Sequence, residues 1–310
     1  MRKLRGRSIR VGSMADAPRG GALALDTGGV PVDPYRTTLY SPAELYDTPS
    51  YTDSLDARTY AWSLRPPTPS DSLAQALHDH AVDQALTGWL TGRHLVGVMG
   101  GHELMRGERA YAEAAHLGAL LGAHHTVATG GGPGAMEAAN LGGRLAHAGP
   151  EALDEALSWL ADTPSFRPSV DAWVSAALPV DSLSDQLGAS PTLGIPTWFY
   201  GHEPPNVFAT AIAKYFRNAT REAILLQVCD AGIVFLPGAA GTVQEIFQDA
   251  CENYYAAPDS VAPMVLVGRA HWTVDYPAWP LLQALARGRA MEPHVHLVDS
   301  IEEAAALVDG

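Results

Sequence analysis

Two glycine-rich segments have the residue types and spacing needed to hold an anion. The first reads Gly-Gly-Gly-Pro-Gly-Ala-Met-Glu at 130–137, and the second reads Pro-Gly-Ala-Ala-Gly-Thr-Val-Gln-Glu at 237–245. Each follows a short apolar run and precedes a helical pattern. Glycine lets the backbone approach a ligand closely, and the free N–H groups at a helix start favour negative charge. One such segment is as often a plain strand-to-helix turn, but two in one chain favour a phosphate site.

Neither segment matches a standard nucleotide fingerprint. The phosphate-binding pattern GxxxxGK[ST] is absent, and the spacing GGGPG differs from the dinucleotide pattern GxGxxG. We therefore expect the second segment to hold a phosphate through its backbone N–H groups and a hydroxyl, and the first to line the sugar and base of the ligand. The expected phosphate-binding residues are Gly238, Ala239, Ala240, Gly241 and Thr242.

Two charged side chains are placed to act beside these segments. Glu245 falls about one turn into the helix expected after the second segment, close to a sugar whose phosphate lies in that segment. Arg221 lies in a mostly apolar helical pattern and offers a fork-shaped donor for a phosphate or a base. Arg217 lies one turn earlier, and Lys214 extends the same positive row. The plain alternatives are a first-turn glutamate favoured by the helix dipole and surface arginines.

Several further side chains are weaker candidates for contacts with the ligand. Asn206 either donates to the ligand or caps a helix starting at residue 207. Met136 either packs on the base or belongs to the core, and Glu137 is either a sugar contact or a first-turn helix charge. The expected ribose- and base-binding set is Gly130, Gly131, Gly132, Gly134, Met136, Glu137, Gly101, Asn206 and Arg217.

Short apolar runs alternate with helical patterns from residue 71 onward. Strands are expected at 94–99, 126–129, 193–199, 232–236, 263–267 and 294–298, and helices at 71–90, 106–121, 135–148, 151–161, 171–177, 207–228, 242–256, 280–289 and 301–308. This alternation predicts an α/β fold: a Rossmann-like, doubly wound parallel sheet with helices on both faces. Ligands of such sheets bind at the carboxyl ends of the strands, where both glycine segments fall.

The first 70 residues are rich in Pro, Gly, Asp, Ser and Thr, and they predict an irregular N-terminal arm ahead of a domain at 71–310. Aromatic residues within 1–70 indicate that this arm packs on something, either the domain or a partner subunit.

Composition narrows the classes of function. The chain has 310 residues, 47% of them hydrophobic, and a formal net charge of −14, which argues against nucleic-acid binding. No apolar run reaches the roughly 18 residues that a membrane span requires, and the basic start is not followed by the apolar part of a signal peptide. Two cysteines, Cys229 and Cys251, form no disulfide framework, and the scattered histidines show no metal-ligand spacing. We expect a cytoplasmic protein without metal or redox cofactor.

With its two glycine segments at 130–137 and 237–245, the chain resembles the lonely-guy (LOG) family of nucleotide phosphoribohydrolases, whose members pair a GGGxGxM segment with PGGxGTxxE. Gly100-Gly101-His102, Glu203-Pro204-Pro205-Asn206 and Gly232-Ile233-Val234-Phe235 are similar to the branch that acts on pyrimidine and purine nucleoside 5′-monophosphates. The resemblance covers residues 95–270. It implies hydrolysis of the N-glycosidic bond to free base and ribose 5-phosphate, with Arg221 and Glu245 as the catalytic pair. It also implies a homodimer or higher homo-oligomer.

The chain departs from the family pattern at Ala239, where the family has glycine, and at Gln244, where many members have glutamate. If residue 239 needs a positive φ, alanine there would reshape the phosphate site. Two other functions remain open on the residues alone. One is a non-catalytic nucleotide or cofactor carrier or sensor on the same fold, and the other is an assembly protein that acts through its N-terminal arm.

Overall fold

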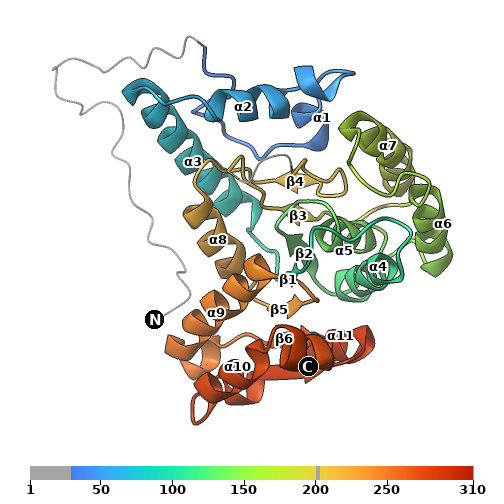
Figure 1. Ribbon diagram of the computed structural model, residues 1–310, viewed down its shortest axis with the longest axis vertical. Coiled ribbons are helices and arrows are strands. Elements are labelled where there is room, and N and C mark those ends of the chain that lie inside the picture. Colours follow the sequence, from blue (N-terminus) through green and yellow to red (C-terminus); the bar gives the residue numbers. More distant parts are fainter. Residues whose placement is uncertain (1–28, 200–202, 310) are drawn as a thin grey trace.

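The computed structural model describes residues 29–199 and 203–309, and its centre is a seven-stranded, wholly parallel sheet in the order β4-β3-β2-β1-β5-β6-β7 (Figure 1). The strands are β1 Leu95–Met99, β2 Thr126–Thr129, β3 Leu193–Gly194, β4 Ala211–Ile212, β5 Gly232–Phe235, β6 Met264–Val267 and β7 Val295–Val298. The predicted α/β, Rossmann-like class is confirmed.

Helices cover both faces of this sheet. The longer helices are α2 Leu55–Ser63, α3 Pro69–Trp89, α4 Arg109–Gly122, α5 Ala135–Arg144, α6 Pro150–Leu160, α7 Val170–Gln186, α8 Asn218–Gln227, α9 Ala240–Tyr255, α10 Ala278–Ala286 and α11 Ile301–Asp309. The short ones are α1 Pro42–Leu45, η2 Tyr51–Asp53, η3 Pro258–Ser260, η4 His271–Asp275 and η5 Glu292–His294. Figure 1 shows α3, α8 and α9 on one side of the sheet and α4 to α7 on the other.

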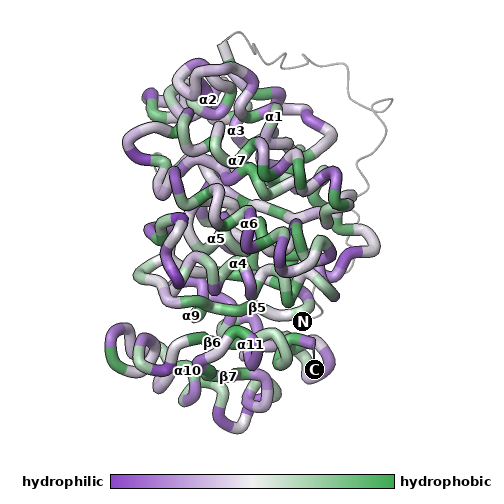
Figure 2. The backbone as a smooth tube through the Cα atoms, turned by 90° about the vertical axis from the view of Figure 1, so that its right-hand side faces the viewer, coloured by the Kyte–Doolittle hydropathy of each residue, from purple (hydrophilic) through white to green (hydrophobic). Residues whose placement is uncertain are grey.

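Alternate residues of each strand fill two separate cores. Val96 and Val98 of β1 pack with α4, α5 and α11, whereas Leu95 and Met99 pack with α3, α8 and α9. This period of two is what a strand buried on both faces requires. Figure 2 looks onto the α4–α7 face, where hydrophobic and hydrophilic stretches alternate along the helices, as expected when one side of each helix faces the sheet.

The strand order reverses between β1 and β5, which are paired from Val96 opposite Gly232 to Met99 opposite Phe235. From β1 the chain moves outward through β2, β3 and β4, and then returns to the other side of β1 with β5. A crevice for a ligand is expected at the carboxyl ends of the strands at such a reversal. The segments that follow β1, β2 and β5 therefore meet at one place.

The N-terminal arm contains helices and covers the sheet edge at β4. Tyr40 and Ile212 exchange two backbone hydrogen bonds of 3.0 and 2.9 Å, and Tyr40, Trp62, Trp198 and Phe216 share a third hydrophobic cluster. The prediction of an irregular arm at 1–70 therefore needs correction at α1 and α2. The start of α2 carried a readable signal, because the Ser54 hydroxyl accepts a hydrogen bond from the backbone N–H of Ala57. Residues 1–28 of the predicted arm lie outside the described part.

The predicted helix at 207–228 is wrong in its first half. Residues 211–212 form β4, and α8 begins only at Asn218. The apolar run pairs with β3 instead, through Ala213 N–H and Gly194 O at 2.9 Å. Asp79 of α3 then accepts from the backbone N–H groups of Phe216 and Arg217, which lie 137 and 138 residues further along the chain. The strand expected at 193–199 is likewise shortened to β3.

Among the helices of the described ranges, none is both long and apolar enough to cross a membrane.

Candidate functional site

The segments after β1, β2 and β5 are tied together at the carboxyl edge of the sheet. Gly101, which follows β1, donates its N–H to the carbonyl of Pro237 in the second glycine segment at 3.1 Å. Its own carbonyl accepts from the N–H of Ala135, at the start of α5, at 3.0 Å. Gly101 thus links the two glycine segments through its backbone, and a side chain at Gly134 would collide with it, since a Cβ there would lie 2.6 Å from Gly101 O.

The first glycine segment is held by a buried polar network. Gly131 donates its N–H to the Thr129 hydroxyl at 3.0 Å, and that hydroxyl donates to Asn140 Oδ1 at 2.7 Å. Gly131 has φ +74°, and a Cβ there would lie 2.7 Å from the Pro196 ring, so glycine is needed. The turn is therefore rigid and its backbone can lie directly against neighbouring groups.

Asn206 supports this turn from the next segment. Its Nδ2 donates to Gly132 O at 3.0 Å and to Asn140 Oδ1 at 3.1 Å, while its Oδ1 accepts from the N–H of Ala209 at 2.9 Å. No helix begins at residue 207, so the helix-cap alternative is wrong. The amide is fully buried and already bonded, which assigns Asn206 to supporting the glycine turn rather than to contacting a ligand.

Glu137 is engaged in a buried ion pair. Its carboxylate forms a two-pronged pair with Arg106 at 2.5 and 3.2 Å, and both side chains are 1% exposed. This pair favours a structural role for Glu137, and the sugar contact stays a prediction. Met136, in contrast, lies over the turn: its sulfur would be 2.8 Å from a Cβ at Gly130, and its terminal methyl 2.9 Å from one at Gly132. Met136 is the side chain that covers the first glycine segment.

The second glycine segment leads directly into α9. Ala239 is the residue before the helix, with φ −113° and ψ −142°, so no left-handed conformation is required and alanine carries no strain there. The first helical hydrogen bond runs from Val243 N–H to Ala239 O at 3.0 Å. The N–H groups of Ala240, Gly241 and Thr242 come before this first bond and have no acceptor within the helix, and Ala239, Ala240 and Gly241 are exposed. Free N–H groups at an exposed helix start are what an anion site uses.

Gly238 fits this turn only because it lacks a side chain. A Cβ there would lie 2.2 Å from the Thr242 hydroxyl. The residue is also held by His271 of η4, whose Nε2 lies 2.8 Å from Gly238 O and 3.2 Å from Gly238 N. Sequence reasoning missed His271, because no local pattern links it to a turn 33 residues earlier.

Arg221 and Glu245, the predicted catalytic pair, are brought together on the neighbouring helices α8 and α9. Arg221 Nη1 lies 3.9 Å from Glu245 Oε1 and would lie 3.5 Å from a Cβ at Gly130, so the guanidinium also touches the first glycine turn. Its other terminal nitrogen lies 3.2 Å from Glu222 Oε1. The pair therefore stands where the two glycine segments and α8 meet.

The predicted positive row is not formed. Lys214 is fully buried in an ion pair with Asp56 of the N-terminal arm, with 2.6 Å between Nζ and Oδ1. Arg217 is the exposed N-cap residue of α8, and its carbonyl accepts from the backbone N–H of Arg221, one turn further on, at 3.1 Å. Of the three cations, Arg221 is the one with a contact to the first glycine turn and to Glu245 among the described residues.

Burial and, after it, the nearby charge of Glu222 raise the pKa of Glu245 to about 8, although Arg221 opposes the shift. Glu245 is therefore mostly protonated at neutral pH and can donate a proton. Arg221 Nε and Glu222 Oε2 are buried without a hydrogen-bond partner in the described part of the chain. This arrangement can place a proton donor and a guanidinium beside a ligand whose anionic group lies at the start of α9.

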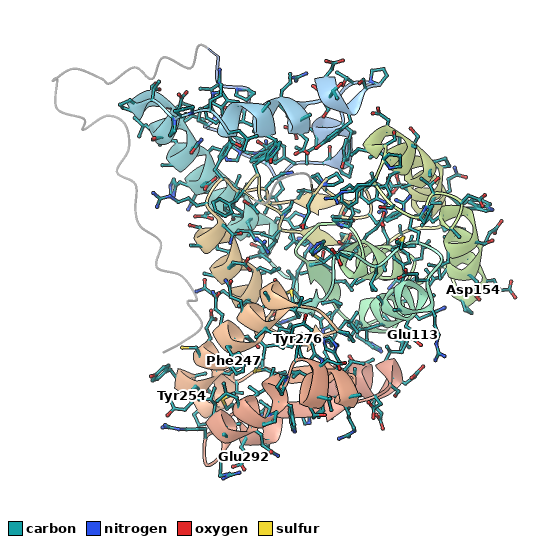
Figure 3. The ribbon with its side chains drawn as sticks, in the orientation of Figure 1. Glu113, Asp154, Phe247, Tyr254, Tyr276 and Glu292 are labelled. Atoms are coloured by element: carbon teal, nitrogen blue, oxygen red, sulfur yellow. The ribbon has the colours of Figure 1, made fainter. Side chains whose placement is uncertain are left out.

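A separate open hollow of about 440 Å³ lies between α4 and α6, where His116 Nε2 is 3.4 Å from Asp154 Oδ1. Figure 3 labels Asp154 and Glu113 on this side of the molecule, away from Phe247 and Tyr254 of α9. The hollow contains none of the residues predicted from the sequence. Nowhere in residues 29–199 and 203–309 do three or more His, Cys, Asp or Glu side chains gather as a metal ion would require.

Comparison with known proteins gives structural neighbours only. No protein family model and no curated protein sequence matches the chain. Among solved structures, a molybdenum cofactor binding protein from Rippkaea orientalis is similar at 16% identity and a TM-score of 0.43, covering 70% of this chain and 96% of its own. Two structures of the molybdenum cofactor carrier protein from Chlamydomonas reinhardtii are similar at 17% identity, the same coverage, and TM-scores of 0.42 and 0.41.

Proposed function

We propose that the chain binds a nucleoside 5′-monophosphate at the carboxyl edge of its sheet and hydrolyses the N-glycosidic bond, releasing a free base and ribose 5-phosphate. The observation that carries this proposal is the meeting of Arg221 and Glu245 beside the first glycine turn, next to the open start of α9. Phosphate binds the first turn of α9 between Gly238 and Thr242. The sugar then lies between that turn and Gly130.

The chemistry of bond cleavage fits these groups. Breaking a C1′–N bond builds positive charge on the sugar and negative charge on the departing base, by analogy with glycoside hydrolysis. Glu245, protonated at neutral pH, donates a proton to the base, and the Arg221 guanidinium stabilises negative charge on the leaving group or the phosphate. Water attacks the sugar carbon as the C1′–N bond breaks, and its released proton returns to the Glu245 carboxylate, which restores the protonated form.

A second candidate is a carrier that binds a nucleotide-type cofactor without cleaving it. One observation favours it: an uncharged Glu245 is a poor base or nucleophile at neutral pH, so binding without turnover is consistent with the same site. The similar solved structures are cofactor carriers or binders by name, but they are too distant to choose between the two functions.

A panel of nucleoside 5′-monophosphates separates the candidates. The full chain is incubated with each nucleotide, and free base is measured by chromatography, with Glu245→Ala as the control. Base release by the wild type and its loss in Glu245→Ala support hydrolysis. Tight binding by calorimetry without base release in either protein overturns hydrolysis and supports the carrier.

A further inference from the structure

Arg221 lies between two buried carboxyl groups that come from different helices. Its Nη2 is 3.2 Å from Glu222 Oε1 on α8, and its Nη1 is 3.9 Å from Glu245 Oε1 on α9. The side chains of Arg221, Glu222 and Glu245 are 11%, 8% and 13% exposed. A guanidinium that holds one carboxylate on each side has a fixed orientation, since its plane is rigid.

Glu222 is satisfied on only one of its two oxygens. Oε1 accepts from Arg221 and, at 3.4 Å, from Asn218 Nδ2. Oε2 is buried and has no hydrogen-bond partner among the described residues. A buried carboxylate oxygen left without a partner is destabilising, so its presence beside Arg221 calls for an explanation.

We propose that Glu222 is a positioning residue of this site: it fixes one edge of the Arg221 guanidinium and stabilises the uncharged form of Glu245. This inference rests on the proposed function and deepens it, because it explains how the proton donor is kept ready. With Glu245 ionised, the cluster would bury two negative charges against one positive charge. A proton on Glu245 leaves one of each, which is far less unfavourable in a buried site.

The charged groups that act on Glu245 support this assignment. On α8, Glu222 raises its pKa and Arg221 lowers it, after burial itself, which raises it most. The first glycine segment, Gly130–Gly134, brings no titratable side chain, and neither does α10, which packs on α9. On η4, His271 is engaged at Gly238, at the other end of the helix start. Two further carboxylates lie on neighbouring segments: Glu203, with Oε2 3.6 Å from the position of a Cβ at Gly132, and Asp249, one turn further along α9. Of the three carboxylates, Glu222 is the one whose charge raises the pKa of Glu245.

The test compares the wild type with Glu222→Gln, which removes the charge, and Glu222→Asp, which keeps it. The control is Glu113→Gln, which removes a glutamate charge from an exposed Arg–Glu pair with Arg109 on the opposite face of the sheet. Two quantities are measured from pH 5 to pH 10: base release from a nucleoside 5′-monophosphate, and infrared absorption of the protonated carboxyl group, assigned by its loss in Glu245→Gln. Thermal melting first establishes that each variant is folded.

We expect activity to fall as pH rises through about 8 in the wild type and in Glu113→Gln. In Glu222→Gln the pH at which activity declines is lower by about one unit or more. In Glu222→Asp this pH stays near the wild-type value. An unchanged position in Glu222→Gln, or the same displacement in Glu222→Asp, overturns the inference. A variant that merely disturbs the fold would lower activity at every pH without changing the pH at which activity declines.

Failure of the proposed function is recognised separately. If the wild type releases no base, hydrolysis fails, and the infrared signal alone decides the role of Glu222. A titration midpoint of the protonated carboxyl signal that is lower by about one pH unit or more in Glu222→Gln supports the inference, and an unchanged midpoint overturns it. If Glu222→Gln does not fold, Glu222→Met, which also removes the charge, replaces it in both measurements.

Discussion

Glu245 folds into a site that suits its uncharged form, and this has a consequence for stability. The pKa of Glu245 in the folded protein is about 8, above the value near 4.3 expected in the unfolded chain. The folded state therefore holds this proton more tightly. The stabilisation that results is complete below the unfolded pKa and is lost as the pH rises toward 8. We expect Glu245→Gln to be more stable than the wild type above pH 7, by a margin that grows between pH 5 and 8. Melting curves across this range check it; a constant margin would contradict the assignment.

We expect Glu137 to serve the fold rather than the ligand site. Glu137→Gln leaves Arg106 buried without its charged partner, which costs about 3–5 kcal/mol of unfolding free energy for a broken buried pair. We expect denaturant unfolding to show this loss, while ligand affinity of the folded fraction stays at the wild-type value. Weaker ligand binding with unchanged stability would support Glu137 as a sugar contact.

The difference between Glu245 and Glu137 shows what the sequence can indicate about single residues. Both follow a glycine segment in the first two turns of a helix, and local spacing treats them alike. Only the partner decides: Glu137 meets Arg106, 31 residues earlier, whereas Glu245 meets Arg221 on a neighbouring helix. Arg221 and Glu245 were predictable through the paired motifs, and Glu222 was not, because its importance lies in the shared guanidinium.

At the scale of elements, the start of α9 depends on glycine at residue 238, because any side chain there would collide with the helix. Gly238→Ala places a Cβ 2.2 Å from the Thr242 hydroxyl and displaces the first turn of α9. We expect a lower melting temperature, with a destabilisation of about 1–3 kcal/mol as for overpacked sites.

Gly241→Ala is the matched control within the same segment. A Cβ at Gly241 meets nothing within 4 Å, and the residue lies in the first turn of α9. We expect unchanged or slightly higher stability, because alanine is the better helix former. Equal melting temperatures for the Gly238 and Gly241 variants would contradict the geometry of this turn.

Elements with a strong local signal were predicted closely, and those formed by distant pairing were not. The strand at 126–129 matches β2, and the expected parallel sheet with both faces covered is confirmed. The local pattern at 207–228 predicts one helix. Its first half pairs with β3, and Asp79 of α3 terminates that segment, a contact that no local pattern contains.

At the scale of the whole molecule, the N-terminal arm is part of the domain that it covers. It lies at the end of the sheet beyond β4 (Figure 1), and Asp56 of α2 joins it to the domain. The Asp56 carboxylate accepts from Lys214 Nζ at 2.6 Å, from Trp198 Nε1 at 2.8 Å and from the Tyr51 hydroxyl at 3.0 Å. The arm thus holds the segment after β3 that supports the first glycine turn.

Asp56→Asn tests this role. The substitution leaves the Lys214 ammonium buried without a counter-charge, and we expect a loss of about 3–5 kcal/mol in unfolding free energy. Asp53→Asn, at an exposed position of the same arm, is the control and should stay within about 0.5 kcal/mol of the wild type. Chemical denaturation checks both; equal stability of the two variants would show that the arm is not anchored through Asp56.

Titration calorimetry tests most directly whether a phosphorylated nucleoside binds at the start of α9. The wild type is titrated with a nucleoside 5′-monophosphate, with the same nucleoside lacking its phosphate, and the monophosphate titration is repeated on Gly238→Ala. We predict that removing the phosphate and substituting Gly238 each weaken binding at least tenfold, a loss of about 1.4 kcal/mol or more. Absence of binding to any monophosphate, or equal affinity of the wild type and Gly238→Ala, would contradict the claim.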